Sequence, residues 1–258
     1  MLIDLNCDMG EGFGAYAIGD DSQMLTIVSS ANIACGFHAG DPRVMHQTLT
    51  MAKANGVQPG AHPGFFDLFG FGRRQIRGQT VEEIEWQIMY QIGALQGIAK
   101  SVGCSVRHVK THGALGNMAA EDPELALAVA RAIKTVDPEL IFVVMPGLET
   151  ERAGRQLGLP LIREIYADRA YAESGKLLPR KIAGAVIHDA IAARDRVVEM
   201  VKRRAIIAVS GTRLPAEIDS VCVHGDTPGA VAMAREIRRG LEGQGFEIRP
   251  MSEIIAQR

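Results

Sequence analysis

The sequence lacks the features that mark disulfide-rich, nucleic-acid-binding, membrane-spanning and secreted proteins. Its four cysteines are scattered and form no Cys-x-x-Cys pair, which excludes a disulfide scaffold and favours a reducing compartment. The 28 basic and 30 acidic residues nearly cancel, without a long basic block, so neither nucleic acid nor an anionic membrane is an expected partner. No run of about 18 apolar residues is present to cross a bilayer. Asp4 stands where a signal peptide would need a basic or apolar residue, so we expect a cytoplasmic location.

Several compact catalytic motifs are absent as well. The chain contains no His-Glu-x-x-His, no Gly-x-x-x-x-Gly-Lys-Ser/Thr and no Gly-x-Ser-x-Gly. The stretch Gly10-Glu11-Gly12-Phe13-Gly14 is glycine-rich, but its spacing is not that of the dinucleotide-binding fingerprint. Any chemistry must therefore come from residues that lie far apart in the sequence and meet in the fold.

Strand-length apolar segments alternate with helix-length amphipathic segments along all 258 residues. Helix starts are indicated by Asp41-Pro42, Asp122-Pro123 and Thr227-Pro228, and by a capping box from Thr80 to Glu83. Residues 204–218 are typical of a short β-hairpin inserted before the last strand. The alternation predicts an α/β fold with a parallel sheet, closed as a TIM-like (β/α)7 barrel in one domain, residues 1–258. The expected strands are 2–8, 31–38, 56–62, 107–112, 140–145, 161–167 and 219–224.

Four of the seven histidines stand where an expected strand gives way to a loop, each with a glycine as neighbour or close by. They are His38, His62, His112 and His224. The packing of a hydrophobic core does not require histidine at these positions. Because parallel strands of a barrel all end on one face, and active sites lie on that face, the four side chains are expected to converge there.

Strand parity adds more polar groups to the same place. Side chains alternate between the two faces of a strand, so Asp4, Asn6 and Asp8 share one face of the first strand. In the same way, Lys110 shares the face of the two neighbouring histidines, and Asp168 ends the polar face of the sixth strand. Helices outside the barrel need apolar partners, so the polar faces are expected to point inward. Buried charges are costly unless they are paired, which favours a functional interior.

Imidazole and carboxylate groups on a common face could serve as general acid and base near neutral pH. They could equally bind a divalent metal ion that activates water, and spacing along the chain does not separate these alternatives. Arg73 and Arg74 lie on an irregular glycine-rich loop and are candidates to hold a substrate carboxylate or phosphate, as is Arg169. The competing interpretation for each arginine is a solvated loop residue.

Seven segments of uncommon sequence are spread over nearly the whole chain. They are Asp4-Leu5-Asn6-Cys7-Asp8-Met9-Gly10-Glu11, Ser30-Ala31-Asn32-Ile33-Ala34-Cys35-Gly36-Phe37-His38-Ala39-Gly40-Asp41-Pro42, Gly60-Ala61-His62-Pro63, Gly70-Phe71-Gly72-Arg73-Arg74, His112-Gly113-Ala114-Leu115, Ala167-Asp168-Arg169-Ala170-Tyr171 and Cys222-Val223-His224-Gly225-Asp226. In this order they resemble the LamB/YcsF family. Two positions depart from the pattern of that family: Thr111 replaces a proline, and Gly116 replaces an aromatic residue.

The resemblance implies the A subunit of an ATP-dependent 5-oxoprolinase, which opens the lactam of 5-oxo-L-proline to L-glutamate. It implies that ATP is hydrolysed together with two partner subunits, B and C. In this interpretation the catalytic candidates are Asp8 and the four strand-end histidines. The substrate-binding candidates are Asn6, Arg73, Arg74, Lys110, Asp168 and Arg169. The family is similar in fold to the glycoside hydrolase/deacetylase barrels, some of which bind metal, and by that looser analogy the ligands of a metal would be Asp8, His38 and His62.

Two other functions remain open from the sequence. One is a stand-alone, metal-dependent hydrolase or deacetylase that acts on a carbohydrate or an amide. The other is a barrel that only binds a lactam and serves as a scaffold for its partners. The number of titratable groups at the strand ends favours an enzyme over a binding module.

Overall fold

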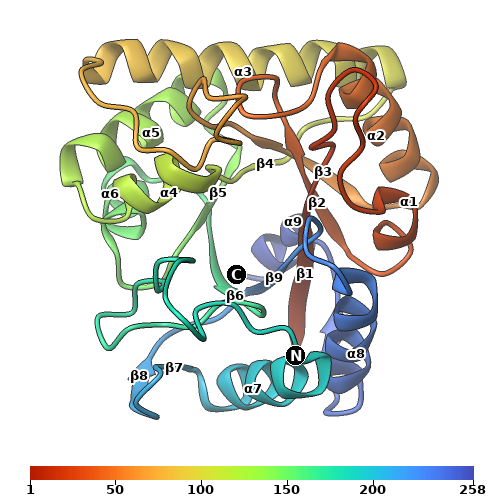
Figure 1. Ribbon diagram of the computed structural model, residues 1–258. Coiled ribbons are helices and arrows are strands. Elements are labelled where there is room, and N and C mark those ends of the chain that lie inside the picture. Colours follow the sequence, from red (N-terminus) through yellow and green to blue (C-terminus); the bar gives the residue numbers. More distant parts are fainter.

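The computed structural model describes residues 1–258 and contains a closed parallel barrel of seven strands. The strands follow the order β1-β2-β3-β4-β5-β6-β9, and pairing of β9 with β1 closes the ring (Figure 1). The predicted TIM-like barrel of seven strands is thereby confirmed. The bounds are β1 (Leu2–Met9), β2 (Ser30–Ala34), β3 (Gln58–His62), β4 (His108–Val109), β5 (Ile141–Val144), β6 (Leu161–Tyr166) and β9 (Ser220–His224).

Helices surround the barrel on its outer side, and α3 packs on α5 as α7 packs on α8 (Figure 1). Their bounds are α1 (Asp21–Met24), α2 (Pro42–Ala54), α3 (Val81–Val102), α4 (Gly113–Ala119), α5 (Pro123–Val136), α6 (Glu149–Leu157), α7 (Ala190–Arg203), α8 (Ala230–Glu242) and α9 (Met251–Ala256). The predicted hairpin is present as β7 (Ala205–Ile207) and β8 (Arg213–Pro215), which pair antiparallel. An additional strand, β10 (Glu247–Ile248), pairs with the start of β1. No helix combines the length and the apolar character that crossing a membrane requires.

Most predicted helix starts are confirmed by their capping contacts. The Asp41 carboxylate accepts hydrogen bonds from the backbone at the start of α2, and Thr80 forms the expected capping box on α3. The start predicted at Thr227-Pro228 is wrong, since α8 begins at Ala230. The physical reason is Gly229, whose φ of 85° is left-handed and cannot continue a right-handed helix.

The alternation predicted for the strands is borne out by their burial and contacts. In β1 the outward residues Ile3, Leu5 and Cys7 belong to the hydrophobic core between barrel and helices. The inward residues Asn6 and Asp8 bond to polar side chains of β2, of β6 and of the segment after β4. Only two residues of β4 are paired as a strand, yet the residues that follow it continue with the same alternation. The barrel interior is therefore polar along several strands.

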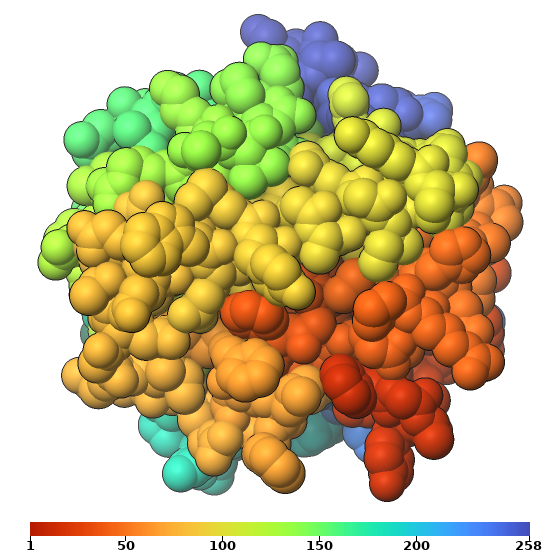
Figure 2. Space-filling view, turned by 90° about the horizontal axis from the view of Figure 1, so that it is seen from above, coloured from red at the N-terminus to blue at the C-terminus, as the bar shows by residue number.

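The amino-terminal end of the barrel is closed by a small apolar cluster. Met251 and Ile254 of α9 pack against Ile141, Val143 and Ile162, which point inward from β5 and β6. The loop of residues 63–80 connects β3 to α3, and Figure 2 shows this loop beside α2 and α3 on one outer face of the molecule. The interior of the barrel is therefore open only at the carboxyl ends of the strands.

Candidate active site

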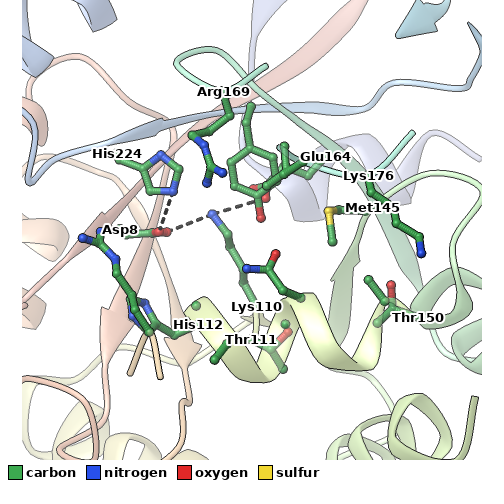
Figure 3. A pocket seen from close by; sticks show the side chains of 18 of the residues that line it. Asp8, Lys110, Thr111, His112, Met145, Thr150, Glu164, Arg169, Lys176 and His224 are labelled. Atoms are coloured by element: carbon green, nitrogen blue, oxygen red, sulfur yellow. Dashed lines mark hydrogen bonds and ion pairs between the residues drawn. The ribbon is translucent and has the colours of Figure 1, made fainter. Parts of the chain in front are cut away.

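A cavity of about 620 Å³ lies at the carboxyl ends of the strands (Figure 3). This volume is in the range of small-molecule binding sites. Its walls carry acidic, basic and imidazole side chains from β1, β3, β6 and β9, and from the segments after β4 and β6. The lining residues that matter below are Asp8, Glu11, His62, Arg73, Lys110, His112, Glu164, Tyr166, Arg169 and His224.

Below the cavity, a network of buried amides and hydroxyls forms the floor. Asn6 donates to Glu164 at 2.8 Å and to Ser220 at 2.7 Å, and it accepts from Asn32 at 2.7 Å. Asn32 also donates to Asp8 at 2.8 Å. All of these polar atoms are paired, so the network holds the acidic groups above it in defined positions. Asn6, predicted to bind substrate, lies in this floor and does not line the cavity.

Lys110 is the buried cation at the centre of the site. Its Nζ lies 2.9 Å from Asp8 Oδ1 and 3.2 Å from Glu164 Oε2 (Figure 3). Burial alone would lower the pKa of Lys110, but Asp8, Cys222 and Glu164 raise it well above its usual range. Burial would likewise raise the pKa of Asp8, but His62 and Lys110 lower it well below its usual range. Both groups are therefore charged at neutral pH and hold each other in place.

His224 and Asp168 form a dyad on the other wall. His224 Nδ1 donates to both carboxylate oxygens of Asp168 at 2.8 Å, and Nε2 is directed toward the cavity. Burial tends to raise the pKa of Asp168, but His224 lowers it, so the carboxylate stays ionised. The Nε2 atom lies 3.9 Å from Asp8 Oδ2. An imidazole oriented in this way by a buried carboxylate is suited to accept a proton from water.

The remaining three strand-end histidines gather around Glu11. The His38 and His112 rings stack with their centroids 3.7 Å apart, and His62 Nε2 lies 3.0 Å from His112 Nδ1. Glu11 Oε1 is 3.5 Å from His38 Nε2 and 3.4 Å from His112 Nδ1. Burial lowers the pKa values of His38 and His112 well below their usual range, so both rings are neutral. Burial also raises the pKa of Glu11 well above its usual range.

The predicted arginines occupy three different positions. Arg73 lines the cavity, donates to Asp226 at 2.6 Å and stacks on the Phe71 ring. Arg74 is mostly exposed and pairs with Asp67, away from the cavity. Arg169 lines the cavity, but it also donates to backbone carbonyl groups of the loop that follows β6. Only Arg73 therefore combines a place on the wall with an exposed guanidinium.

Comparison with known proteins gives the family. Residues 3–256 match the model of the LamB/YcsF family. The chain belongs to this family. It is 55% identical over 252 residues to the 5-oxoprolinase A subunit from Rhodopseudomonas palustris strain BisB5, which covers 98% of this chain and 99% of that relative. The crystal structure of the lactam utilization protein from Thermus thermophilus is 44% identical, with a TM-score of 0.91, over 96% of this chain and 99% of that one.

A more distant likeness concerns the fold alone. The T48 deacetylase with substrate superposes with a TM-score of 0.53 at 15% identity, over 99% of this chain and 91% of that one. The predicted likeness to deacetylase barrels is confirmed at the level of architecture. The relatives carry the name of one subunit of an enzyme, which indicates that those proteins belong to complexes of several subunits.

Three residues of this site are not among the predicted site residues, although strand parity places Glu164 on the inward face. Glu11 lies in a glycine-rich turn after β1, Asn32 on β2 and Glu164 on β6. The sequence does contain indications of all three. Glu164 lies on the same strand face as Asp168, and Glu11 and Asn32 lie within two of the segments that resemble the LamB/YcsF family. Their roles depend on cross-strand contacts, which sequence spacing does not contain.

The metal ligands suggested by analogy are only partly grouped by the structure. His38 and His62 fall in a group with Glu11 and His112, whose candidate ligand atoms all lie within 4.8 Å of one another. Asp8 falls in a second group, with Cys222 and His224. Glu11 Oε1 and both ring nitrogens of His38 are buried and lack any hydrogen-bond partner. The donor set of the first group suits a divalent transition metal.

Proposed function

We propose that this chain is the lactam-opening subunit of an ATP-dependent 5-oxoprolinase, converting 5-oxo-L-proline to L-glutamate. Membership of the LamB/YcsF family and the names of its relatives support the substrate. The observation that carries the proposal is the dyad of Asp168 and His224, whose free ring nitrogen faces Asp8 across the cavity. This arrangement provides a base for water at the wall of a pocket of suitable size.

A lactam amide is a poor electrophile, because its nitrogen shares electron density with the carbonyl. Transfer of the γ-phosphoryl group of ATP to the lactam oxygen makes the ring carbon open to water. In our proposal the partner subunits B and C carry out that ATP-dependent step. The phosphorylated lactam then reaches the cavity of this chain, where basic side chains after β6, including Lys176 and Arg180, lie on the wall.

Opening of the ring needs a base and an acid. We assign the base to His224, which takes a proton from water as the oxygen attacks the ring carbon. The carbon–nitrogen bond then breaks to give γ-glutamyl phosphate, and a proton moves to the nitrogen from the side of Asp8 and His62, which lie 3.3 Å apart. A second water hydrolyses the acyl phosphate, which releases phosphate and L-glutamate. Arg73 holds the substrate carboxylate at the cavity mouth. Lys110 keeps Asp8 ionised and fixed in position.

The test is release of L-glutamate from 5-oxo-L-proline by the purified complex of this chain with subunits B and C, with and without ATP. We expect His224→Gln to lower the rate by about 10²–10⁴-fold, the usual contribution of a general base. His46→Gln is the matched control, since His46 is exposed on α2. Full activity of His224→Gln, or of both Asp8→Ala and His62→Ala, overturns the assignment of the site.

A second function is favoured by the group of Glu11 and three histidines. A metal ion held there would supply Lewis acidity toward a substrate oxygen, as a metal-dependent amide hydrolase or deacetylase requires. This alternative predicts hydrolysis by the chain alone, without ATP or partner subunits. A scaffold that only binds the lactam predicts instead that histidine variants retain both calorimetric 5-oxoproline binding and the full activity of the complex.

A further inference from the structure

The tautomers of His62 and His112 follow from their hydrogen bonds. His62 Nδ1 lies 2.7 Å from the carbonyl oxygen of Lys110, and His112 Nε2 lies 2.8 Å from that of Phe71. A carbonyl oxygen only accepts hydrogen bonds, so both of these ring nitrogens carry protons. The other nitrogen of each ring is the one that can bind a metal ion. These two nitrogens, His62 Nε2 and His112 Nδ1, lie 3.0 Å apart.

Two further candidate ligand atoms lie in the same space. Glu11 Oε1 lies 3.4 Å from His112 Nδ1, and His38 Nε2 lies 3.5 Å from Glu11 Oε1. Both atoms are buried without a hydrogen-bond partner. With His62 Nε2 and His112 Nδ1 they place four candidate ligand atoms within 4.8 Å of one another, and one metal ion would engage all four.

We propose that Glu11, His38, His62 and His112 together bind one divalent transition-metal ion of the zinc class. Metal–nitrogen bonds of about 2.0–2.1 Å place the ligand atoms of a tetrahedron about 3.3–3.4 Å apart. Three of the six separations between these ligand atoms, 3.0, 3.4 and 3.5 Å, are close to that spacing, and all six lie within 4.8 Å. This ligand set differs from the set of Asp8, His38 and His62 suggested by fold analogy, and it does not depend on the proposed function.

The surroundings of the four residues support the same conclusion. The carbonyl groups that accept from His62 and His112 fix which nitrogen of each ring is left to bind a metal ion, as the hydrogen-bond partners of metal-binding histidines usually do. The loop over the site packs tightly on two of the rings: a side chain added at Gly72 would begin 2.6 Å from His38 and 2.7 Å from His112. Asp8 Oδ2 lies beside the group, 3.3 Å from His62 Nε2.

Metal binding is tested on the full chain without a histidine tag. Elemental analysis of protein purified without chelator is expected to find one ion per chain. Chelator-treated protein is then titrated with Zn²⁺ by calorimetry and with Co²⁺ by visible absorption, where tetrahedral coordination gives intense bands. Less than stoichiometric uptake of both ions, or a Co²⁺ spectrum of six-coordinate type, overturns the proposal.

Variants locate the ion. We expect Glu11→Gln and His112→Gln each to weaken Zn²⁺ binding by about a hundredfold or more, since even outer partners are worth about 10–100-fold. His46→Gln, on the exposed face of α2, is the control and keeps the affinity. Circular dichroism verifies that each variant is folded. If Glu11→Gln or His112→Gln does not fold, His38→Gln is measured in its place. Unchanged affinity in folded Glu11 and histidine variants places the ion elsewhere and refutes the ligand set.

Discussion

Replacement of the buried cation, Lys110→Met, is the sharpest test of the site's electrostatics. Methionine keeps much of the side-chain length but leaves Asp8 and Glu164 without the ammonium group that now lies 2.9 and 3.2 Å away. Removal of one partner from a buried ion pair costs about 3–5 kcal/mol, because the remaining charge stays desolvated. For a chain of this length, each 1 kcal/mol shifts the melting temperature by about 2–4 °C. We therefore expect a loss of about 6–20 °C.

The pH dependence of this loss follows from the two pKa shifts. The pKa of Asp8 is lowered from 3.8, so its contribution to stability is present above that value and is lost as the pH falls through the folded pKa. The pKa of Lys110 is raised from 10.5, so its contribution is present below that value and is lost only above the folded pKa. The cost of Lys110→Met is thus expected to be constant between these limits and to shrink in acid.

Urea unfolding followed by circular dichroism measures the cost at several pH values. Lys100→Met is the matched control, because Lys100 is exposed in the last turn of α3. Adding Glu164→Gln to Lys110→Met removes one of the two unpaired charges and is expected to recover part of the stability. Equal destabilisation by Lys110→Met and Lys100→Met, or no recovery in the double variant, would refute the reasoning.

Three further predictions concern single residues. Asp168→Asn leaves His224 without its carboxylate partner, so glutamate release by the complex should fall by about 10²–10⁴-fold with little change in KM; unchanged kcat contradicts the dyad. Gly60→Ala would drive a methyl group into the buried His108 ring and should destabilise by about 1–3 kcal/mol, whereas Gly97→Ala, with open space on α3, should be neutral or slightly stabilising. Asp4 has its pKa raised from 3.8 to about 6, chiefly by burial, so its contribution is full in acid and lost as the pH rises through about 6. Asp4→Asn should therefore remove a fall of about 3 kcal/mol in unfolding free energy between about pH 4 and pH 8; equal pH profiles contradict it.

The sequence predicts the barrel well because its two periodicities are local properties. Alternation of strand and helix segments, proline after a capping residue and the capping box at Thr80 depend on neighbours within a few positions. The prediction was wrong at the start of α8, because the left-handed backbone of Gly229 sets where that helix begins. This conformation depends on how the chain leaves β9. The short β10 was missed because two residues carry no periodic signal.

Most residues of the site were predictable from the sequence, but the way they pair with one another was not. Strand parity placed Asp8, Lys110 and Asp168 inside the barrel, and the structure does so. It also separates the strand-end histidines into two sets: His224 pairs with Asp168, and the other three surround Glu11. Arg73 and Arg74 look alike in the sequence, yet adjacent residues on a turning loop point in different directions, and only Arg73 reaches the cavity.

The sequence by itself determined the fold class, the family and the set of polar side chains that a parallel barrel brings to one face. Only the tertiary structure decided which of these side chains share protons, which pair as ions and which four converge in one buried place. The reason is physical: periodicity and capping are written in consecutive residues, whereas hydrogen bonds and ion pairs of about 3 Å depend on strand register and loop path.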